Sequence, residues 1–282
     1  MQHRGGLLPH GRDADERPCL LPLLAPRRRA PLGGRSRRIP HRPRLVHRLS
    51  TPGDSGMDRS AGPKRIRLST TPSREDLARL RIGDVVHLDG LIYTAREGVY
   101  MRACEQGDAL PMDLPRESAA NFHCSPAATV EPDGSFTMGA VTATASFRFS
   151  KWIGEWFRLS GAKLIIGKGG MTSADYLEHF VPNGAIYLTT VGYGTGALLG
   201  RGIKRVKALH WREDLGLAQA MWVIEAENMG PFIVESDLEG NSLFERENER
   251  VSQNLARVYE GTKPAVLRRF GETDDRSDEL IG

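Results

Sequence analysis

The sequence has little cysteine, and what it has is scattered. Cys19, Cys104 and Cys124 are the three cysteines of its 282 residues, and no two of them form a CxxC pair. An odd number of widely spaced cysteines argues against a disulfide framework and favours a reducing compartment. We therefore expect a cytoplasmic chain that does not assemble a metal site from its own thiolates.

Long apolar runs are also missing. A membrane-spanning helix needs roughly 20 consecutive apolar residues, and the longest candidates here are interrupted by arginine, proline or glycine. With 39% hydrophobic and 26% charged residues, the composition is typical of a soluble globular protein. A membrane partner is therefore not expected.

The positive charge is concentrated at one end of the chain. The net charge is +4, but residues 1–56 contain 12 arginines and four acids, so the remainder carries −4. A nucleic-acid interaction would therefore depend on the arginine-rich end and on its strongly salt-dependent contacts. We expect no nucleic-acid partner for the folded part.

Composition divides the chain into three parts. Residues 1–60 are rich in arginine, proline and glycine and are predicted to be disordered, because they cannot bury enough apolar surface. A targeting segment, a native tail and a mis-assigned extension before Met57 all fit this composition. Residues 61–245 are predicted to form one α/β domain, and residues 246–282 a charged helix and tail.

Within the middle part, hydrophobic periodicity predicts alternating helices and strands, with order beginning near Thr71. The predicted helices cover residues 71–80, 96–107, 150–161, 174–180, a stretch starting at 194, and 245–260. The predicted strands are two runs about a Gly90 break within 83–95, then 163–167, 185–191, 206–211, 220–227 and 231–237, with a hairpin-like turn at 238–241.

Two glycine-rich stretches bear on nucleotide binding. GYGTGALLG at 192–200 lacks the GxGxxG spacing and a following acidic residue, so it predicts close strand–helix packing instead of a dinucleotide site. IGKGG lacks the first glycine and the Ser/Thr of a phosphate-binding P-loop. ATP binding is therefore not expected.

Five segments between about Leu80 and Phe244 carry recognisable motifs: GDVVHLDGLIYTAR, TATASFRF, LIIGKGGM, AIYLTTVGYGTGALL and ALHWREDLGLAQAMWVIEAENMGPFIVESDLEGNSLF. In this order they resemble the C-terminal half of class I fumarases and the β subunit of L-tartrate dehydratase. The resemblance is specific because three motifs occur in the family's order and spacing: YTAR, IGKGG and HW-x-x-DLG.

The resemblance implies a hydro-lyase that acts on a small dicarboxylate, with fumarate and malate first and tartrate or mesaconate as alternatives. It implies a swivelling β/β/α fold with a mixed sheet and flanking helices. It also implies a [4Fe–4S] cluster held by an α-type partner subunit, in a homodimer of heterodimers. The alternative is a non-catalytic dicarboxylate-binding or assembly module derived from this family.

Cationic residues at two of the matching motifs suit a dicarboxylate. Two carboxylates call for at least two cations, and arginine binds a carboxylate through two parallel hydrogen bonds. Matching YTAR and IGKGG implies substrate contacts for Arg96, Lys168 and Gly169, with Lys168 also contacting the transition state. The alternative for Arg96 is an ordinary surface arginine at a helix start.

The family motif G-P-T-T-x-x-R-M is altered here. Gly139-Ala140-Val141-Thr142 takes its first positions, but no arginine follows at the expected step. A second register places Thr144 and Arg148 at the Thr-x-x-x-Arg spacing. It implies a carboxylate contact for Arg148 and proton transfer by Thr144, with Thr142 as the runner-up. The alternatives are a surface arginine and a threonine that caps or lines a strand.

Overall fold

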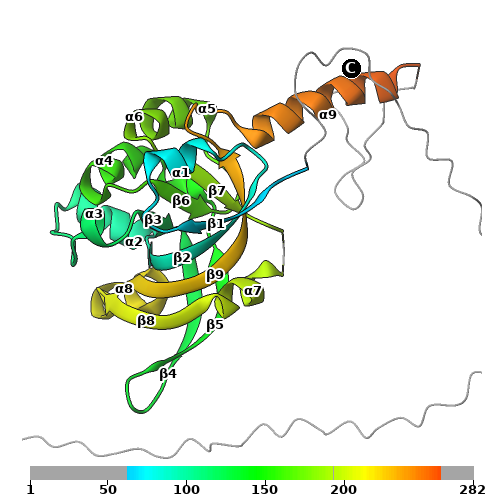
Figure 1. The fold of residues 1–282 in the computed structure, drawn as a ribbon. Coiled ribbons are helices and arrows are strands. Elements are labelled where there is room, and N and C mark those ends of the chain that lie inside the picture. Colours follow the sequence, from blue (N-terminus) through cyan, green and yellow to red (C-terminus); the bar gives the residue numbers. More distant parts are fainter. Residues whose placement is uncertain (1–61, 193, 262–282) are drawn as a thin grey trace, which may run out of the picture. The chain divides into compact units, whose positions relative to one another are not determined.

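The computed structural model describes residues 62–192 and 194–261 (Figure 1). The predicted extension at 1–60, with Cys19, and the acidic end after residue 261 lie outside the described residues. Within the described residues no helix is long and apolar enough to cross a bilayer.

A seven-stranded mixed sheet forms the centre of the domain, with the order β1-β2-β3-β6-β7-β9-β8. Its strands are β1 (Arg65–Ser69), β2 (Val85–Thr94), β3 (Ala120–Phe122), β6 (Leu164–Gly167), β7 (Ile186–Thr190), β8 (Ile203–His210) and β9 (Met221–Ser236). Strands β2, β3, β6 and β7 run parallel, whereas β9 pairs antiparallel with both β7 and β2. The β2–β9 pairing therefore closes five strands into a ring.

Helices flank this sheet, as the sequence predicted (Figure 1). They are α1 (Arg74–Ala78), α2 (Glu97–Tyr100) with a π-helical turn (Met101–Glu105), α3 (Leu114–Glu117), α4 (Ser150–Ser160), α5 (Ser173–Asp175) with a π-helical turn (Tyr176–Phe180), α6 (Val181–Asn183), α7 (Thr195–Arg201), α8 (Arg212–Gln219) and α9 (Leu243–Tyr259). A 3-10 turn (Ser146–Phe149) leads into α4. The expected α/β class is confirmed.

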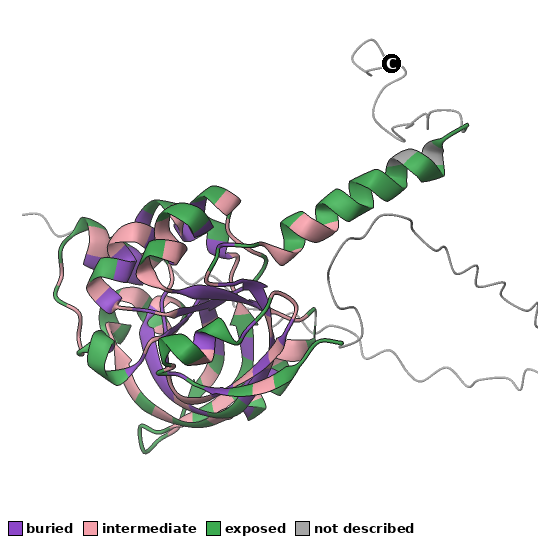
Figure 2. Ribbon diagram, turned by 45° about the horizontal axis from the view of Figure 1, so that its top comes forward, coloured by how far each residue is buried: buried purple, intermediate pink, exposed green. Residues whose placement is uncertain are grey.

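The central strands β3, β6 and β7 are buried on both faces, whereas β2 and β9 also carry partly exposed residues (Figure 2). Ile166 belongs to one apolar core and the preceding Ile165 to a second core, which also contains the α4 side chains Trp156 and Phe157. Successive side chains of a strand point to opposite faces, so an uninterrupted apolar run such as LIIG serves both cores.

A two-stranded hairpin, β4 (Cys124–Val130) with β5 (Phe136–Ala143), protrudes from the ring (Figure 1). Helix α7 packs directly on β5, because a Cβ on Gly200 would overlap the carbonyl oxygen of Gly139. The close strand–helix packing predicted for residues 192–200 is confirmed.

Some predicted boundaries were wrong. Order begins before Thr71, because β1 already pairs with β2. Gly90 does not split β2: it has φ +120° and lies against Thr70, whose hydroxyl leaves no room for a side chain. The two strands predicted at 220–237 form the single strand β9, with a bulge near Asn228. The turn after β9 leads into helix α9 instead of a strand.

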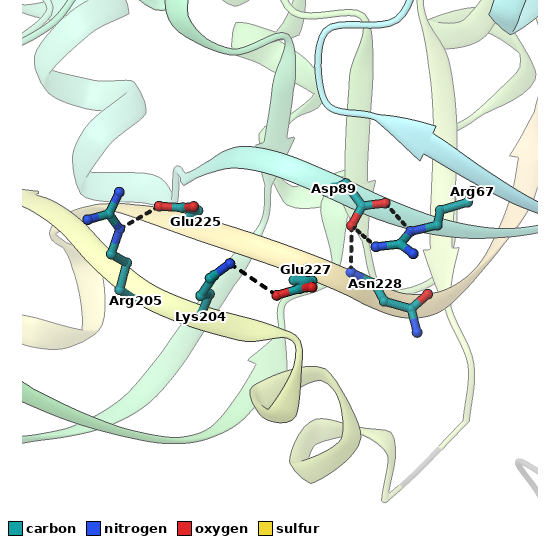
Figure 3. Close-up of polar contacts among 7 residues, drawn as sticks. All are labelled: Arg67, Asp89, Lys204, Arg205, Glu225, Glu227 and Asn228. Carbon is teal, nitrogen blue, oxygen red and sulfur yellow. Dashed lines mark hydrogen bonds and ion pairs between the residues drawn. The ribbon is translucent and has the colours of Figure 1, made fainter.

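Charged pairs cover the solvent face where β1, β2, β8 and β9 meet (Figure 3). Arg205 on β8 binds Glu225 on β9 at 2.5 Å, and Lys204 lies 3.3 Å from Glu227. Asp89 binds Arg67 and also accepts the backbone N–H of Asn228 at 2.9 Å, which stabilises the bulge. Such pairs between exposed side chains contribute little to stability.

Candidate functional site

The candidate site lies where the parallel strands end. Arg96 follows β2, His123 follows β3 and Lys168 follows β6, and these three strands pair in parallel with one another. The carboxyl ends of parallel strands meet at one edge of a sheet, which is where ligands bind in many α/β proteins. The predicted residues Arg96 and Lys168 are thereby brought to the same edge.

Arg96 is held between the sheet and a helix. It is the N-cap of α2, is partly buried, and its Nη1 donates to the carbonyl oxygen of Ala218 at 3.0 Å. This contact uses one of the five guanidinium N–H donors and leaves others for a ligand. The buried side chains Val99 and Tyr100 anchor α2 behind it.

Arg148 is presented by the 3-10 turn before α4. Phe149 is 1% exposed and anchors the turn, whereas Phe147 is 63% exposed and flanks Arg148 on the outside. Nη2 of Arg148 lies 3.4 Å from Oε2 of Glu97, and both side chains are about half exposed. Because Glu97 follows Arg96, this contact joins the two predicted arginines. An exposed pair of this length is weak and can open for a carboxylate.

Lys168 is exposed at the end of β6, and its backbone is fixed by the segment 144–146. Lys168 N–H donates to the Thr144 carbonyl at 3.1 Å, and Ser146 N–H donates to the Lys168 carbonyl at 3.3 Å. The ammonium forms no ion pair with any residue in the ranges 62–192 and 194–261. Gly169 has φ +73° and an open side, so a ligand can approach its backbone.

The two candidate threonines occupy different positions. Thr142 is exposed on β5, where it pairs with Ser125. Thr144 lies beyond the end of β5, is partly buried, and donates its N–H to the His123 carbonyl at 2.6 Å. Of the two, only Thr144 is bonded through its backbone to Lys168.

A buried polar cluster behind this edge was not predicted. His123 Nδ1 lies 2.7 Å from Ser146 Oγ, and His123 Nε2 lies 2.7 Å from the Tyr100 hydroxyl. Asn121 Nδ2 donates to Tyr100 at 2.9 Å, and the Tyr187 hydroxyl donates to Ser146 at 2.7 Å. All five side chains are fully buried. The signal in the sequence was two polar residues, Asn121 and His123, alternating in a short apolar stretch.

Burial keeps this cluster uncharged. It lowers the pKa of His123 to about 3, because the imidazolium would lose its hydration. It raises the pKa of the Tyr100 hydroxyl well above its usual value. The cluster therefore orients neighbouring groups through hydrogen bonds, while the charge of the site comes from Arg96, Arg148 and Lys168.

A second polar cluster supports the far side of the glycine turn. The Tyr176 hydroxyl accepts the Met171 N–H at 2.8 Å and donates to Glu235, which also accepts the Ser242 hydroxyl at 2.5 Å. Burial raises the pKa of Glu235, and the two hydrogen bonds oppose that shift. Tyr176 and Glu235 press on Gly170, where a Cβ would lie 3.0 Å from the tyrosine oxygen.

The described cysteines do not suit a metal cluster. Cys104 is half-buried and Cys124 is buried, and no group of three potential metal ligands occurs in residues 62–192 and 194–261. Burial raises the pKa of Cys104 to about 11 and that of Cys124 well above its usual range. Metal ligation requires thiolates, so neither side chain is prepared for it.

Comparison with known proteins gives consistent matches. A family model described as "Fumarase C-terminus" matches residues 46–247. "Putative L(+)-tartrate dehydratase subunit beta" of Methanocaldococcus jannaschii is 34% identical over 186 residues, 65% of this chain and 93% of that protein. L(+)-tartrate dehydratase subunit beta of Escherichia coli is 31% identical over 188 residues, covering 66% and 89%. "Putative fumarate hydratase class I" of Geobacillus stearothermophilus is 28% identical over 195 residues, 69% of this chain and 36% of that protein.

Proposed function

Because the chain belongs to the fumarase C-terminal and tartrate dehydratase β-subunit family, we propose that it is the β-type subunit of a hydro-lyase. The enzyme would add water to, or remove it from, a small dicarboxylate. Fumarate and malate are the first candidates, and tartrate and mesaconate are the alternatives. The observation that carries the proposal is the gathering of Arg96, Thr144, Arg148 and Lys168 at one sheet edge.

The charges at this edge suit the reaction. Removing the proton next to a carboxylate gives a dianionic carboxylate, which is stable only among fixed cations. Arg96 and Arg148 would each bind a substrate carboxylate. Lys168 would stabilise the developing charge, and the open backbone at Gly169 would let the substrate approach.

Thr144 would transfer the proton. A threonine alkoxide is unstable at neutral pH unless the surroundings stabilise it. The backbone bond from the Lys168 N–H to the Thr144 carbonyl holds the two residues side by side at the end of β6, and we propose that the Lys168 ammonium stabilises the alkoxide. Thr142, two residues back on the hairpin, is the runner-up.

The remaining components would come from a partner. The chain's described residues offer no set of thiolates for a [4Fe–4S] cluster, so an α-type subunit would ligate it. The two subunits would assemble as a homodimer of heterodimers in the cytoplasm. The domain would be of the swivelling β/β/α type, bringing its cationic edge to the partner.

A second candidate function is a non-catalytic dicarboxylate-binding or assembly module. The altered motif Gly139-Ala140-Val141-Thr142 favours it, because the proline and the first threonine of the family pattern are missing. Such a module would retain dicarboxylate binding through the arginines but would lack turnover.

Co-expression with an α-type subunit and anaerobic purification tests the proposal. We expect consumption of fumarate or mesaconate only when both chains and an intact cluster are present. The loss of alkene absorbance measures this consumption. Thr144→Val should abolish turnover and Thr142→Val should retain it, whereas the reverse result would assign the proton transfer to Thr142. A stable complex with an intact cluster that turns over no dicarboxylate would favour the binding module.

A further inference from the structure

We propose that Tyr100, His123 and Ser146 form a positioning network that fixes the three cations of the site relative to one another. The inference rests on the proposed function, because it concerns how that site holds a dicarboxylate. None of the three side chains is exposed, so they act through the segments that carry Arg96, Arg148 and Lys168.

The network connects three separate parts of the chain. Tyr100 is in helix α2, which begins directly after Arg96. His123 lies between β3 and β4, and Ser146 opens the turn that carries Arg148. The two 2.7 Å contacts of the His123 ring therefore connect the Arg96 helix to the Arg148 turn.

Lys168 is tied to the same network through its neighbour. A Cβ on Gly167 would overlap Ser146 Oγ and would lie 2.7 Å from the Tyr187 hydroxyl. The end of β6 therefore rests directly on the serine hydroxyl. The backbone bonds from Lys168 to Thr144 and Ser146 complete this attachment.

Aromatic packing holds the Arg148 turn from the other side. The Phe149 ring stacks on Tyr100 with centroids 5.1 Å apart and meets His123 edge-on at 4.7 Å. Because Phe149 follows Arg148 directly, the same two network side chains determine where the arginine backbone lies.

The hydrogen bonds have one consistent direction. With Asn121 donating to Tyr100, the tyrosine proton goes to His123 Nε2, and Nδ1–H donates to Ser146 Oγ. In the reverse tautomer the Nε2–H would face the amide N–H of Asn121, whose Nδ2 lies 3.2 Å from Nε2, so two donors would oppose each other. A neutral imidazole with Nδ1–H satisfies both of its ring nitrogens, so the connection is directional and rigid.

A rigid connection matters because a dicarboxylate has a fixed separation between its two charges. Misplacing a binding group by about 1 Å can lower the rate about 100-fold. Loosening the Arg148 turn should therefore weaken the binding of a ligand that contacts several cations more than the binding of a ligand that contacts one.

The test compares succinate with butyrate on the complex of the full chain with its α-type subunit. Calorimetry gives Kd for each ligand without requiring turnover. In the wild-type complex succinate should bind more tightly than butyrate, and Ser146→Ala should reduce that ratio about 10-fold or more. Tyr100→Phe keeps the ring stack, removes one hydroxyl, and should reduce the ratio in the same direction.

Ser160→Ala is the matched control. Ser160 is fully buried like Ser146, but its hydroxyl donates to the Trp156 carbonyl within α4 at 2.7 Å. This change should alter thermal stability and leave the succinate-to-butyrate ratio unchanged.

The outcomes separate the inference from the proposed function. An unchanged ratio in both Ser146→Ala and Tyr100→Phe would overturn the positioning network even if the wild-type complex is an active hydro-lyase. If both variants reduce the ratio but the wild-type complex turns over no dicarboxylate, the network is supported and the hydro-lyase function is rejected. A wild-type complex that binds neither ligand would overturn the network, and turnover of fumarate or mesaconate would still decide the hydro-lyase function.

Discussion

The exposed cationic edge and the buried polar cluster behind it differ in exposure, charge and hydrogen bonding, although both belong to one site. Arg148 is about half exposed and makes one loose contact, whereas His123 is fully buried and uses both ring nitrogens. The edge supplies charge without being required by the fold. The cluster supplies no charge, but it joins the elements on which the edge is built.

This difference follows from the physics of burial. A buried cation would need a paired anion and would lose its attraction for a substrate carboxylate, so the cations remain near water. Exposed side chains are mobile and cannot position themselves. Precision must therefore come from the backbone beneath them, and buried hydrogen bonds provide it.

The largest expected effect is on turnover. Lys168→Ala and Arg148→Ala should each lower kcat/KM about 1,000-fold or more, equivalent to about 4 kcal/mol of transition-state stabilisation, with no change in thermal stability. Arg158→Ala is the control, because within residues 62–192 and 194–261 this exposed arginine of α4 pairs only with Glu155. Wild-type kinetics in both site variants would reject the claim that the exposed edge supplies the charge that the reaction uses.

The next effect is a pH dependence of stability that belongs to the cluster. The pKa of His123 is near 6.5 when unfolded and about 3 in the fold. The unfolded chain therefore binds a proton that the folded chain does not, and stability falls as the pH drops below 6.5. At pH 5 the loss is about 2 kcal/mol.

His123→Gln should remove this contribution. Although the variant is less stable at pH 7.5, it should lose less of its free energy of unfolding than the wild type between pH 7.5 and pH 5. Denaturation of the full chain at both pH values measures this. Parallel losses in the two proteins would show that His123 is protonated in the fold, contrary to its burial.

Glu235 should show a smaller effect of opposite sign. Burial raises its pKa in the fold, and hydrogen bonds from Tyr176 and Ser242 offset part of that shift. The folded chain then holds the proton more tightly, so this stabilising contribution is present at low pH and is lost as the pH rises through the folded pKa. Glu235→Gln should therefore lessen the decline in stability toward neutral pH, measured by the same denaturation series. A steeper decline would contradict the assignment.

The exposed edge could be predicted from the sequence, and the buried cluster could not. Arg96 and Lys168 follow apolar strands in recognisable motifs, so both residues could be named from the sequence, and the strand order of the structure then brings them to one edge. The pairs that build the cluster are each separated by 23 residues, Tyr100 with His123 and His123 with Ser146, and no local pattern joins them. The β4–β5 hairpin was missed for a related reason, because its small residues show no clear apolar alternation.

The smallest effect should come from the charged pairs on the opposite part of the sheet. Arg205→Ala breaks the exposed pair with Glu225 on the β8–β9 face (Figure 3). Exposed pairs contribute about 0.2–1 kcal/mol, so thermal stability should change little, and kcat/KM should stay at the wild-type value. Arg148 and Arg205 are both exposed arginines paired with one glutamate. If Arg205→Ala lowered kcat/KM as much as Arg148→Ala, the position of Arg148 at the strand ends would not explain its effect. The loss of one positive charge anywhere on the surface would then explain both results.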